Sequence, residues 1–392
     1  MPYIPIKYKW FPGLNALRFV AAILVVLMHI HISMKQVGLP ILYEIPILLK
    51  GYGAVSFFFV LSGFLITYLL LDEKDRTKNV DVKTFYWRRV FRIWPLYFLV
   101  VIFGFVFYWF ILPFFGIEFR VEYPKALGVI MYGLFAANIF NSLYHVGGIL
   151  NITWSIAVEE QFYLFWAPFM KLVKKRLFQI IIVAIFFFYS IAVLNGFNYF
   201  QLSDGWMAFV RSLQFHYMAV GGAGAYLLFY HHDRLLKAKI FSNKLLQLIL
   251  CLLIIAYYTL YKKNFIAEIL LPLPLAFLYC WLIINVSVNP KKITHFENKY
   301  THFLGGISYG IYMLHMPVIY FVSYFTKLSP ISFQGSLLYF IIFYSTVIGS
   351  TIVLAHFSNR YFENPINQYG RKWLGSNISP KLRGSVVTSF TK

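Results

Sequence analysis

Apolar runs separated by short polar or basic segments fill most of the sequence. Each run has about the length at which a helix crosses the hydrocarbon core of a bilayer, roughly 20 residues. The pattern predicts an all-α fold, a polytopic bundle of about ten transmembrane helices. The expected spans are residues 13–33, 51–71, 94–115, 155–172, 178–194, 209–230, 244–261, 268–286, 303–325 and 335–358.

The lysines and arginines are confined to some of the connections between these runs, as expected of cytoplasmic loops. They cluster at residues 7–9, 74–92, 171–176, 234–239, 291–299 and 371–372. One more apolar run, at 127–143, would put these clusters out of phase if it also crossed the membrane. We therefore predict that residues 127–150 form a re-entrant or outer-surface segment and that both termini are cytoplasmic.

The chain divides into three predicted parts. Residues 1–12 form a cytoplasmic N-terminus, 13–365 the transmembrane core, and 366–392 a basic, partly disordered cytoplasmic tail. The first apolar run has no small-residue cleavage site, so we expect it to remain as a membrane helix. The predicted location is the inner (plasma) membrane, crossed several times.

Composition supports a lipid environment. Of the 392 residues, 60% are hydrophobic and 12% are charged, about half the charged fraction of a soluble domain. The net charge of +21 would favour nucleic acid in a soluble protein. Because the basic residues lie in short loops, we do not expect the protein to bind nucleic acid. We expect them to contact anionic membrane lipids and a phosphate-bearing donor. Cys251 and Cys280 lie in apolar runs and form no metal motif, so no metal is predicted.

The first run contains two ionisable residues, Arg18 and His29. They share one helix face and lie about 16 Å apart along the axis. Ionisable residues inside a span are costly and indicate function. The alternatives are interfacial snorkelling for Arg18 and a helix-packing hydrogen bond for His29. His29 would lie about 24 Å along the helix, nearer the outer leaflet.

The fourth run begins with Ser155 and Glu159 on one face. This helix would run from outside to inside, which places Glu159 at a depth similar to that of His29. A carboxylate there could orient the histidine as a general base. The alternative is stabilisation of the carboxylate by the helix N-terminus.

Two further segments carry polar side chains at helical spacing. Arg88 and Arg92, at i and i+4, could fork around a phosphate or simply anchor the helix at the inner face. In the ninth run Ser308, Tyr312 and His315 form a polar stripe. Tyr312 and His315, the latter near mid-membrane, are expected to line a cavity, whereas Ser308 favours structural hydrogen bonding. Ser62 and Gly63 in the second run indicate close helix packing.

An ordered set of segments resembles the membrane-bound acyltransferase family 3, whose members acylate surface polysaccharides and related molecules. The segments are GLNALRFVAAILVVLMH, FFFVLSGFLI, FYWRRVFRIWP, WSIAVEEQFYLFWAP, SYGIYMLHMP and YFENP, and they run from Gly13 to Pro365. The resemblance implies that Arg18 and His29 match the family's first-helix pair and that its RxxxR motif matches Arg88 and Arg92. Asn15 stands where the commoner motif has Asp. Some members carry an extra outer hydrolase-like domain, which we do not expect here.

The resulting hypothesis is transfer of an acyl group, in particular acetyl, from cytoplasmic acyl-CoA to a hydroxyl of a glycan, glycolipid or other acceptor. Arg88 and Arg92 would hold the donor phosphates, and Arg18 would line the donor channel. His29 would act as base or acyl carrier, oriented by Glu159. The cavity would be lined by Ser155, Tyr312 and His315. The alternatives are a flippase for lipid-linked saccharides, which inverted repeats would favour, and a non-catalytic scaffold.

Overall fold

The computed structural model describes residues 8, 10–42, 45–173, 176–260, 264–294, 296–328 and 333–377, and every regular element in that part is helical. The elements in chain order are α1 Leu14–Gln36, η1 Pro46–Leu49, α2 Gly51–Thr77, α3 Val82–Val106, η2 Phe107–Ile111, α4 Leu112–Phe114, α5 Lys125–Gly133, α6 Ala137–Leu143, α7 Gly148–Asn151, α8 Trp154–Leu172, α9 Leu177–Gly196, α10 Asp204–Ser212, α11 Phe215–Lys237, α12 Lys239–Ser242, α13 Lys244–Thr259, α14 Phe265–Leu270, α15 Pro272–Val288, α16 Lys299–Gly306, α17 Ser308–Leu328, α18 Leu337–Ser358, η3 Asn359–Glu363 and α19 Asn364–Asn377.

Five of the described helical stretches are long and apolar enough to cross a membrane. They are α1, α2, α9, the continuous stretch from α3 to α4, and the stretch from α18 into α19. A sixth arises if α16 and α17, which meet at a bend of 64°, count as one span. Helices α13 and α15 are apolar but shorter. The chain is therefore a multi-pass membrane protein, and the predicted number of ten crossings stays a prediction.

Local sequence explains where two of the helices begin. The carboxylate of Asp81 accepts hydrogen bonds from the backbone nitrogen of Thr84 at 3.0 Å and from its hydroxyl at 2.6 Å, which caps α3. Asn298 and Thr301 form a reciprocal capping box at the start of α16. These side chains satisfy backbone N–H groups that have no partner within the helix. Each cap therefore fixes the residue at which its helix begins.

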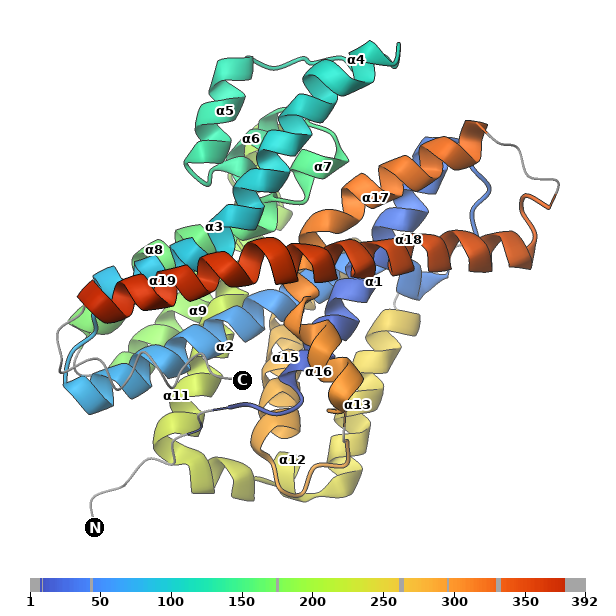
Figure 1. Ribbon diagram of the computed structural model, residues 1–392. Helices are drawn as coiled ribbons and strands as arrows, with labels where there is room; N and C mark the ends of the chain where they lie inside the picture. Colours follow the sequence, from blue (N-terminus) through green and yellow to red (C-terminus); the bar gives the residue numbers. More distant parts are fainter. Residues whose placement is uncertain are drawn as a thin grey trace.

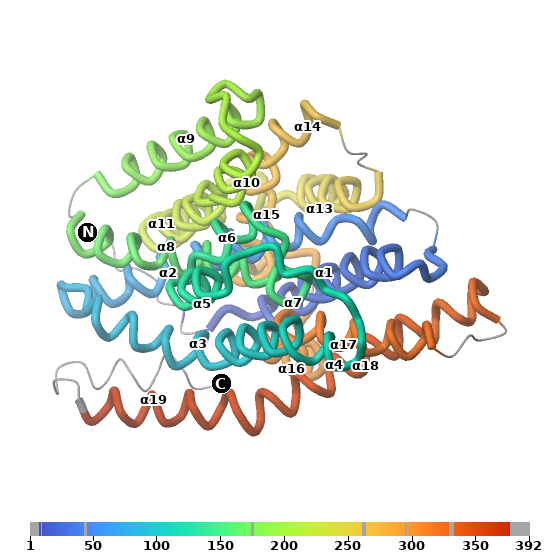
Figure 2. The backbone as a smooth tube through the Cα atoms, turned by 90° about the horizontal axis from the view of Figure 1, so that it is seen from above, coloured from blue at the N-terminus to red at the C-terminus, as the bar shows by residue number. Residues whose placement is uncertain are grey.

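Helices α2 and α11 lie side by side at the centre of the bundle (Figures 1 and 2). A methyl group placed on Gly63 would overlap the backbone of Met218, and one on Gly221 would overlap the backbone of Val60. Only glycine allows two helix backbones to approach this closely. The structure confirms the prediction that Gly63 serves helix packing, and this contact fixes the position of α2.

The segment predicted to be re-entrant or to lie on the outer surface folds into a small helical lobe, at the top of Figure 1. Its helices α5, α6 and α7 contain 9, 7 and 4 residues, too few to cross a bilayer. Two tyrosine hydroxyls hold α7 in place. The backbone nitrogen of Ile149 donates to Tyr108 at 3.0 Å, and that of Gly148 donates to Tyr320 at 3.2 Å. The side of the membrane on which the lobe lies stays a prediction.

The beginning of the predicted polar tail is helical. Helix α19 continues the line of α18 through the π-helical turn η3, and together they form the red and orange band in Figures 1 and 2. The Trp373 ring packs against Trp87 and Phe91 of α3, with centroids 5.1 and 5.9 Å away. Residues 378–392 of the predicted tail lie outside the described residues.

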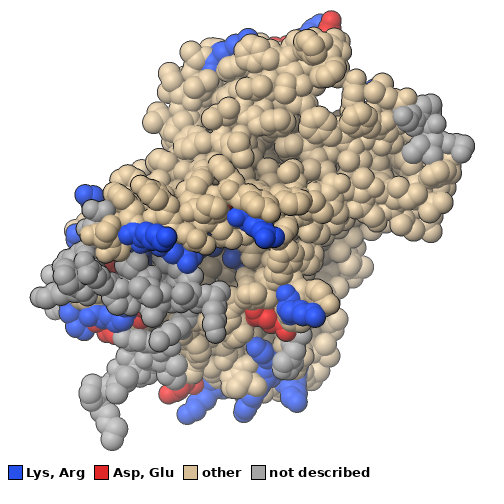
Figure 3. All heavy atoms as spheres, viewed as in Figure 1, with Lys and Arg blue, Asp and Glu red and all other residues tan. Residues whose placement is uncertain are grey.

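Basic side chains are unevenly distributed over the surface. Figure 3 shows most of the visible lysines and arginines on the lower half of the molecule, below a broad region with few charges. A broad surface with few charges is typical of a lipid-facing belt. The side of the membrane that the basic end faces stays a prediction.

Candidate functional site

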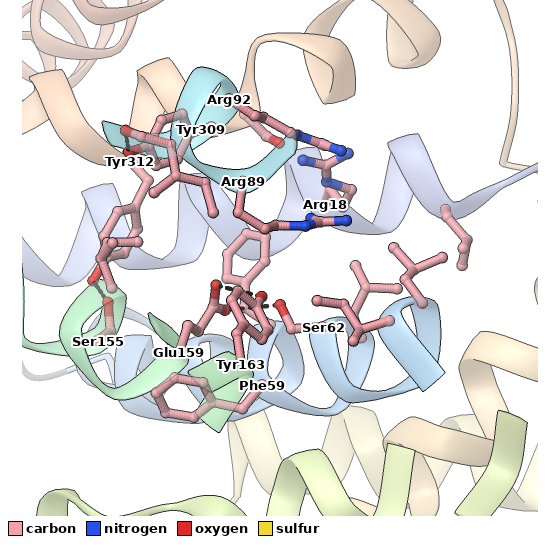
Figure 4. A pocket seen from close by; sticks show the side chains of 18 of the residues that line it. Arg18, Phe59, Ser62, Arg89, Arg92, Ser155, Glu159, Tyr163, Tyr309 and Tyr312 are labelled. Atoms are coloured by element: carbon pink, nitrogen blue, oxygen red, sulfur yellow. Dashed lines mark hydrogen bonds between the residues drawn. The ribbon is translucent and has the colours of Figure 1, made fainter. Parts of the chain in front are cut away.

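A cavity of about 300 Å³ lies among α1, α2, α3, α8 and α17. Apolar residues, Phe59 among them, form part of its wall (Figure 4). The polar side chains that line it from these five helices are Asn15, Arg18, Ser62, Arg89, Arg92, Ser155, Glu159, Tyr163, Ser308, Tyr309 and Tyr312. Apolar walls with a few convergent polar groups are typical of a ligand site.

Three arginines gather at one end of this cavity (Figure 4). Arg18 comes from α1, and Arg89 and Arg92 come from successive turns of α3. No carboxylate of the described residues forms an ion pair with any of the three. Arg89 instead lies over the rings of Phe85 and Tyr163, at 5.6 and 5.8 Å. Unpaired guanidinium groups at membrane depth are costly, so this end of the cavity is suited to an anionic ligand.

Arg88 and Arg92, which were predicted as a pair from their spacing, do not both line the cavity. Arg92 lines the cavity, but its partner on that wall is Arg89, and Arg88 is not among the lining residues. Arg88 and Arg89 point about 100° apart on the helix. The rotation of α3 about its axis, which packing sets, decides which of the two faces the cavity. Arg89 and Arg92, at i and i+3, line the cavity together, whereas Arg88 and Arg92, at i and i+4, do not.

Glu159 lines the cavity and does not contact His29 through a hydrogen bond. Its carboxylate accepts a hydrogen bond from the Ser62 hydroxyl at 2.8 Å and another from the Tyr163 hydroxyl at 3.0 Å. No hydrogen bond joins it to His29, so the expectation that Glu159 orients that histidine is wrong. The two residues were predicted to lie at similar depth, but their side chains have different neighbours.

Ser155 and Tyr312 close the end of the cavity opposite the arginines (Figure 4). Their hydroxyl oxygens are 2.7 Å apart, and the Tyr312 hydroxyl also donates to the carbonyl oxygen of Ile152 at 3.0 Å. The structure thus brings these two predicted cavity-lining residues together. Ser308, on the same helix, lines the cavity, and its buried hydroxyl has no hydrogen-bond partner among the described residues.

His29 and His315 lie in contact just beyond Tyr312. The Nδ1 atom of His29 is 3.0 Å from Nε2 of His315 and 3.1 Å from the carbonyl oxygen of Val25. The Nδ1 atom of His315 is 2.6 Å from the carbonyl oxygen of Tyr312. His315 is completely buried and His29 is half-buried. Neither lines the cavity, contrary to the prediction for His315, and their contact places them at one depth.

Several polar residues that line the cavity were not predicted as site residues from the sequence, among them Ser308, which was expected to serve structural hydrogen bonding. Arg88 was preferred to Arg89 because it lies four residues before Arg92. The spacing of three residues between Arg89 and Arg92 also places them on neighbouring turns of one helix face and could have indicated Arg89. Ser62 was assigned to helix packing alone, and Tyr163 and Tyr309 were not singled out. Nothing in the sequence distinguished these two tyrosines from the many others.

Helix α1 is anchored at the end that carries Arg18. The backbone nitrogen of Gly13, which precedes α1 at a φ of +82°, donates to the Glu297 carboxylate. The side-chain amide of Asn15 lies 3.1 Å from the ring of His302 on α16. These contacts fix the helix axially. Because Arg18 and His29 are separated by 11 residues, the anion-binding end and the imidazole end are held about 16 Å apart.

Comparison with known proteins assigns the family. The model of the acyltransferase 3 domain matches residues 11–356. Peptidoglycan O-acetyltransferase OatA of Listeria monocytogenes is 25% identical over 387 residues, which cover 92% of this chain and 56% of the relative. A candidate O-acetyltransferase of Staphylococcus aureus strain COL is 28% identical over 424 residues, covering 98% and 62%. YrhL of Bacillus subtilis, named as a candidate peptidoglycan O-acetyltransferase, is 25% identical over 392 residues, covering 93% and 56%.

The chain thus spans less than two thirds of the length of these relatives. No solved structure matches it. The family match extends over the helices that build the cavity and includes both histidines. The chain belongs to the acyltransferase family 3 of membrane proteins.

Proposed function

We propose that this protein transfers an acetyl group from cytoplasmic acetyl-CoA to a hydroxyl of a cell-surface glycan or glycolipid. In this proposal the cavity is the donor site, and about ten spans with both termini cytoplasmic place its arginine end toward the cytoplasm. The names of the relatives, which describe O-acetyltransferases, support an O-acetyl product. The basic lower half of the molecule supports the orientation.

The observation that carries the proposal is the set of three unpaired arginines, Arg18, Arg89 and Arg92, at one end of an otherwise largely apolar cavity. The phosphate groups of coenzyme A are the part of the donor that such a set would hold. The uncharged pantetheine arm would occupy the apolar part of the cavity toward Tyr312. The separation of about 16 Å between Arg18 and His29 along α1 is comparable with the length of an extended phosphopantetheine arm.

His29 would act as the general base. It removes the proton from the acceptor hydroxyl while the hydroxyl oxygen attacks the thioester carbonyl carbon. The carbon–sulfur bond then breaks, and the protonated imidazole returns the proton to the departing CoA thiolate. Ser155 and Tyr312 line the cavity at this end, and the carbonyl oxygen of Tyr312 contacts His315, which contacts His29. Because the Tyr312 hydroxyl donates to the carbonyl oxygen of Ile152, it accepts from Ser155, and the pair would form the polar wall against which the thioester lies.

The test is release of free thiol from acetyl-CoA by the purified protein in detergent, with and without soluble peptidoglycan fragments as acceptor. Wild type is compared with His29→Ala and Arg92→Ala. A second donor, acetyl-pantetheine, lacks every phosphate and therefore separates the two roles. We expect Arg92→Ala to impair reaction with acetyl-CoA much more than reaction with acetyl-pantetheine, whereas His29→Ala abolishes both.

Two results would contradict the proposal. The first is thiol release by a folded His29→Ala variant at the wild-type rate. The second is an equal loss with both donors in Arg92→Ala, because the arginine would then not act on the phosphates. A protein that binds lipid-linked saccharide but never consumes acetyl-CoA would instead be a flippase.

A further inference from the structure

His29 and His315 form a hydrogen-bonded chain between the carbonyl oxygens of Val25 and Tyr312. These two carbonyl oxygens indicate which ring nitrogens carry protons. The carbonyl oxygens of Tyr312 and Val25 can only accept hydrogen bonds. Nδ1 of His315, 2.6 Å from the Tyr312 oxygen, must therefore carry a proton. The same argument puts a proton on Nδ1 of His29, which is 3.1 Å from the Val25 oxygen.

The contact between the rings then has only one consistent arrangement. Nδ1 of His29 and Nε2 of His315 are 3.0 Å apart. Since Nδ1 of His29 already carries a proton, Nε2 of His315 must be the acceptor, and His315 must be neutral. A doubly protonated His315 would place two donors against each other. In neutral His29 the proton on Nδ1 leaves Nε2 with a free lone pair.

We propose that His315 is a positioning residue that fixes the tautomer of His29, so that Nε2 of His29 is the basic nitrogen presented to the acceptor hydroxyl. This inference rests on the proposed acyl transfer and adds a residue to it. No hydrogen bond from the described residues occupies Nε2 of His29, and the side chain is half-buried. That nitrogen is therefore the one open to a substrate, whereas Nδ1 is engaged twice.

His315 does the work that a carboxylate does in many catalytic triads, but without a charge. In those triads the carboxylate holds the imidazole in the correct tautomer and stabilises the imidazolium. Here the imidazole of His315 accepts from Nδ1–H of His29 before and after Nε2 takes up the substrate proton. Because His315 is completely buried, a neutral acceptor avoids placing an anion at membrane depth.

The backbone keeps the acceptor lone pair pointing at His29. His315 follows Tyr312 by three residues on α17, so the Tyr312 carbonyl oxygen reaches its Nδ1 within one helical turn. The hydroxyl of Tyr312 is itself fixed by Ser155 and the Ile152 carbonyl oxygen. The tautomer of His29 is therefore tied to the wall of the donor cavity through one tyrosine.

The decisive variants are His315→Leu and His315→Gln. Leucine removes both hydrogen bonds, whereas the glutamine amide can donate to the Tyr312 carbonyl and accept from Nδ1–H of His29. We expect His315→Leu to lower kcat about 100-fold, as loss of an orienting group does, without changing KM for acetyl-CoA. His315→Gln should retain most of the wild-type kcat. Met316→Leu, a volume-conserving change at a side chain that packs on Gly148, is the matched control.

A second measurement does not depend on activity. Nitrogen-15 NMR of protein with labelled histidines distinguishes a protonated from a bare ring nitrogen, with His29→Gln used to assign the signal. We expect His29 to be bare at Nε2 in wild type and in His315→Gln, and to show mixed tautomers in His315→Leu.

The inference is overturned if His315→Leu keeps the wild-type kcat, if His315→Gln is as impaired as His315→Leu when both fold, or if His29 carries its proton on Nε2. Failure of the proposed function has a different signature. In that case wild type releases no thiol, or His29→Ala stays active, whatever tautomer the NMR spectrum reports.

Discussion

The Ser62 hydroxyl donates a hydrogen bond of 2.8 Å to the carboxylate of Glu159, which joins α2 to α8 across the wall of the cavity. Tyr163 supplies a second hydrogen bond from one turn further along α8. With both oxygens of Glu159 occupied in this way, the carboxylate is a structural acceptor in the cavity wall. These hydrogen bonds support a structural role for Glu159 in place of the predicted role of orienting His29.

Glu159→Gln should therefore keep kcat for thiol release within about threefold of wild type, because the amide can still bond both hydroxyls. Glu159→Leu leaves the Ser62 and Tyr163 hydroxyls without their acceptor and should destabilise the protein by about 1–3 kcal/mol. Initial rates and thermal unfolding in detergent measure the two effects. A kcat loss of several hundredfold in a stable Glu159→Gln protein would restore the role of orienting His29.

Arg89→Ala and Arg88→Ala form a matched pair, since the two residues are adjacent and carry the same charge, but only Arg89 lines the cavity. We expect Arg89→Ala to raise KM for acetyl-CoA by about 10- to 100-fold, corresponding to the loss of one charge-assisted hydrogen bond. Arg88→Ala should raise it by much less. Saturation curves for acetyl-CoA test this prediction. A larger increase in KM for Arg88→Ala than for Arg89→Ala would mean that Arg88, and not Arg89, contacts the donor.

Ser308→Ala should weaken donor binding without harming the fold. The Ser308 hydroxyl is buried, lines the cavity and has no hydrogen-bond partner in the part of the chain that the structure describes, so its removal breaks no hydrogen bond there and should not lower the free energy of unfolding. If the donor supplies the missing partner, the variant should bind acetyl-CoA about 2- to 10-fold more weakly. Calorimetric titration measures the affinity, and an unchanged dissociation constant would show that the donor does not reach this wall.

The contact between α2 and α11 makes a prediction about stability. Gly221→Leu would drive a side chain into the backbone at Val60 and should destabilise the protein by more than the roughly 1–3 kcal/mol that is typical of overpacking. Gly349→Leu on α18 is the control, because a Cβ atom added at Gly349 would have no atom of the described residues within 4 Å. Melting temperatures in detergent should fall for the first variant only. Equal melting temperatures would show that the helices are not so close.

Topology can be tested by cysteine labelling in a background of Cys251→Ser and Cys280→Ala. Lys78, whose side chain is 83% exposed beside α2, is predicted to be cytoplasmic, and Glu118, exposed beyond α4, is predicted to be external. An impermeant thiol reagent should label Glu118→Cys in intact cells and Lys78→Cys only after permeabilisation. Labelling of both positions from one side would refute the predicted orientation.

Relations within one helix could be predicted from the sequence, whereas relations between helices could not. The placement of Ser155 with Glu159 on one face of α8, and of Ser308 with Tyr312 on one face of α17, followed from helical periodicity. Periodicity does not say how far a helix is rotated about its axis, which is why Arg88 was chosen over Arg89. Depth calculated from the start of each span assumed straight helices. The 64° bend before α17 is one departure from that assumption, and His315 proved to be level with His29.

The three cavity arginines also bear on how such an enzyme would respond to the state of the cell. On the proposed assignment they hold the part of the donor that is identical in acetyl-CoA and in free CoA. Product should therefore occupy the site about as well as substrate does, since the acetyl group lies at the far end of the arm. The rate of acetylation would then follow the ratio of acetyl-CoA to CoA in the cytoplasm, and envelope modification would slow when carbon supply falls.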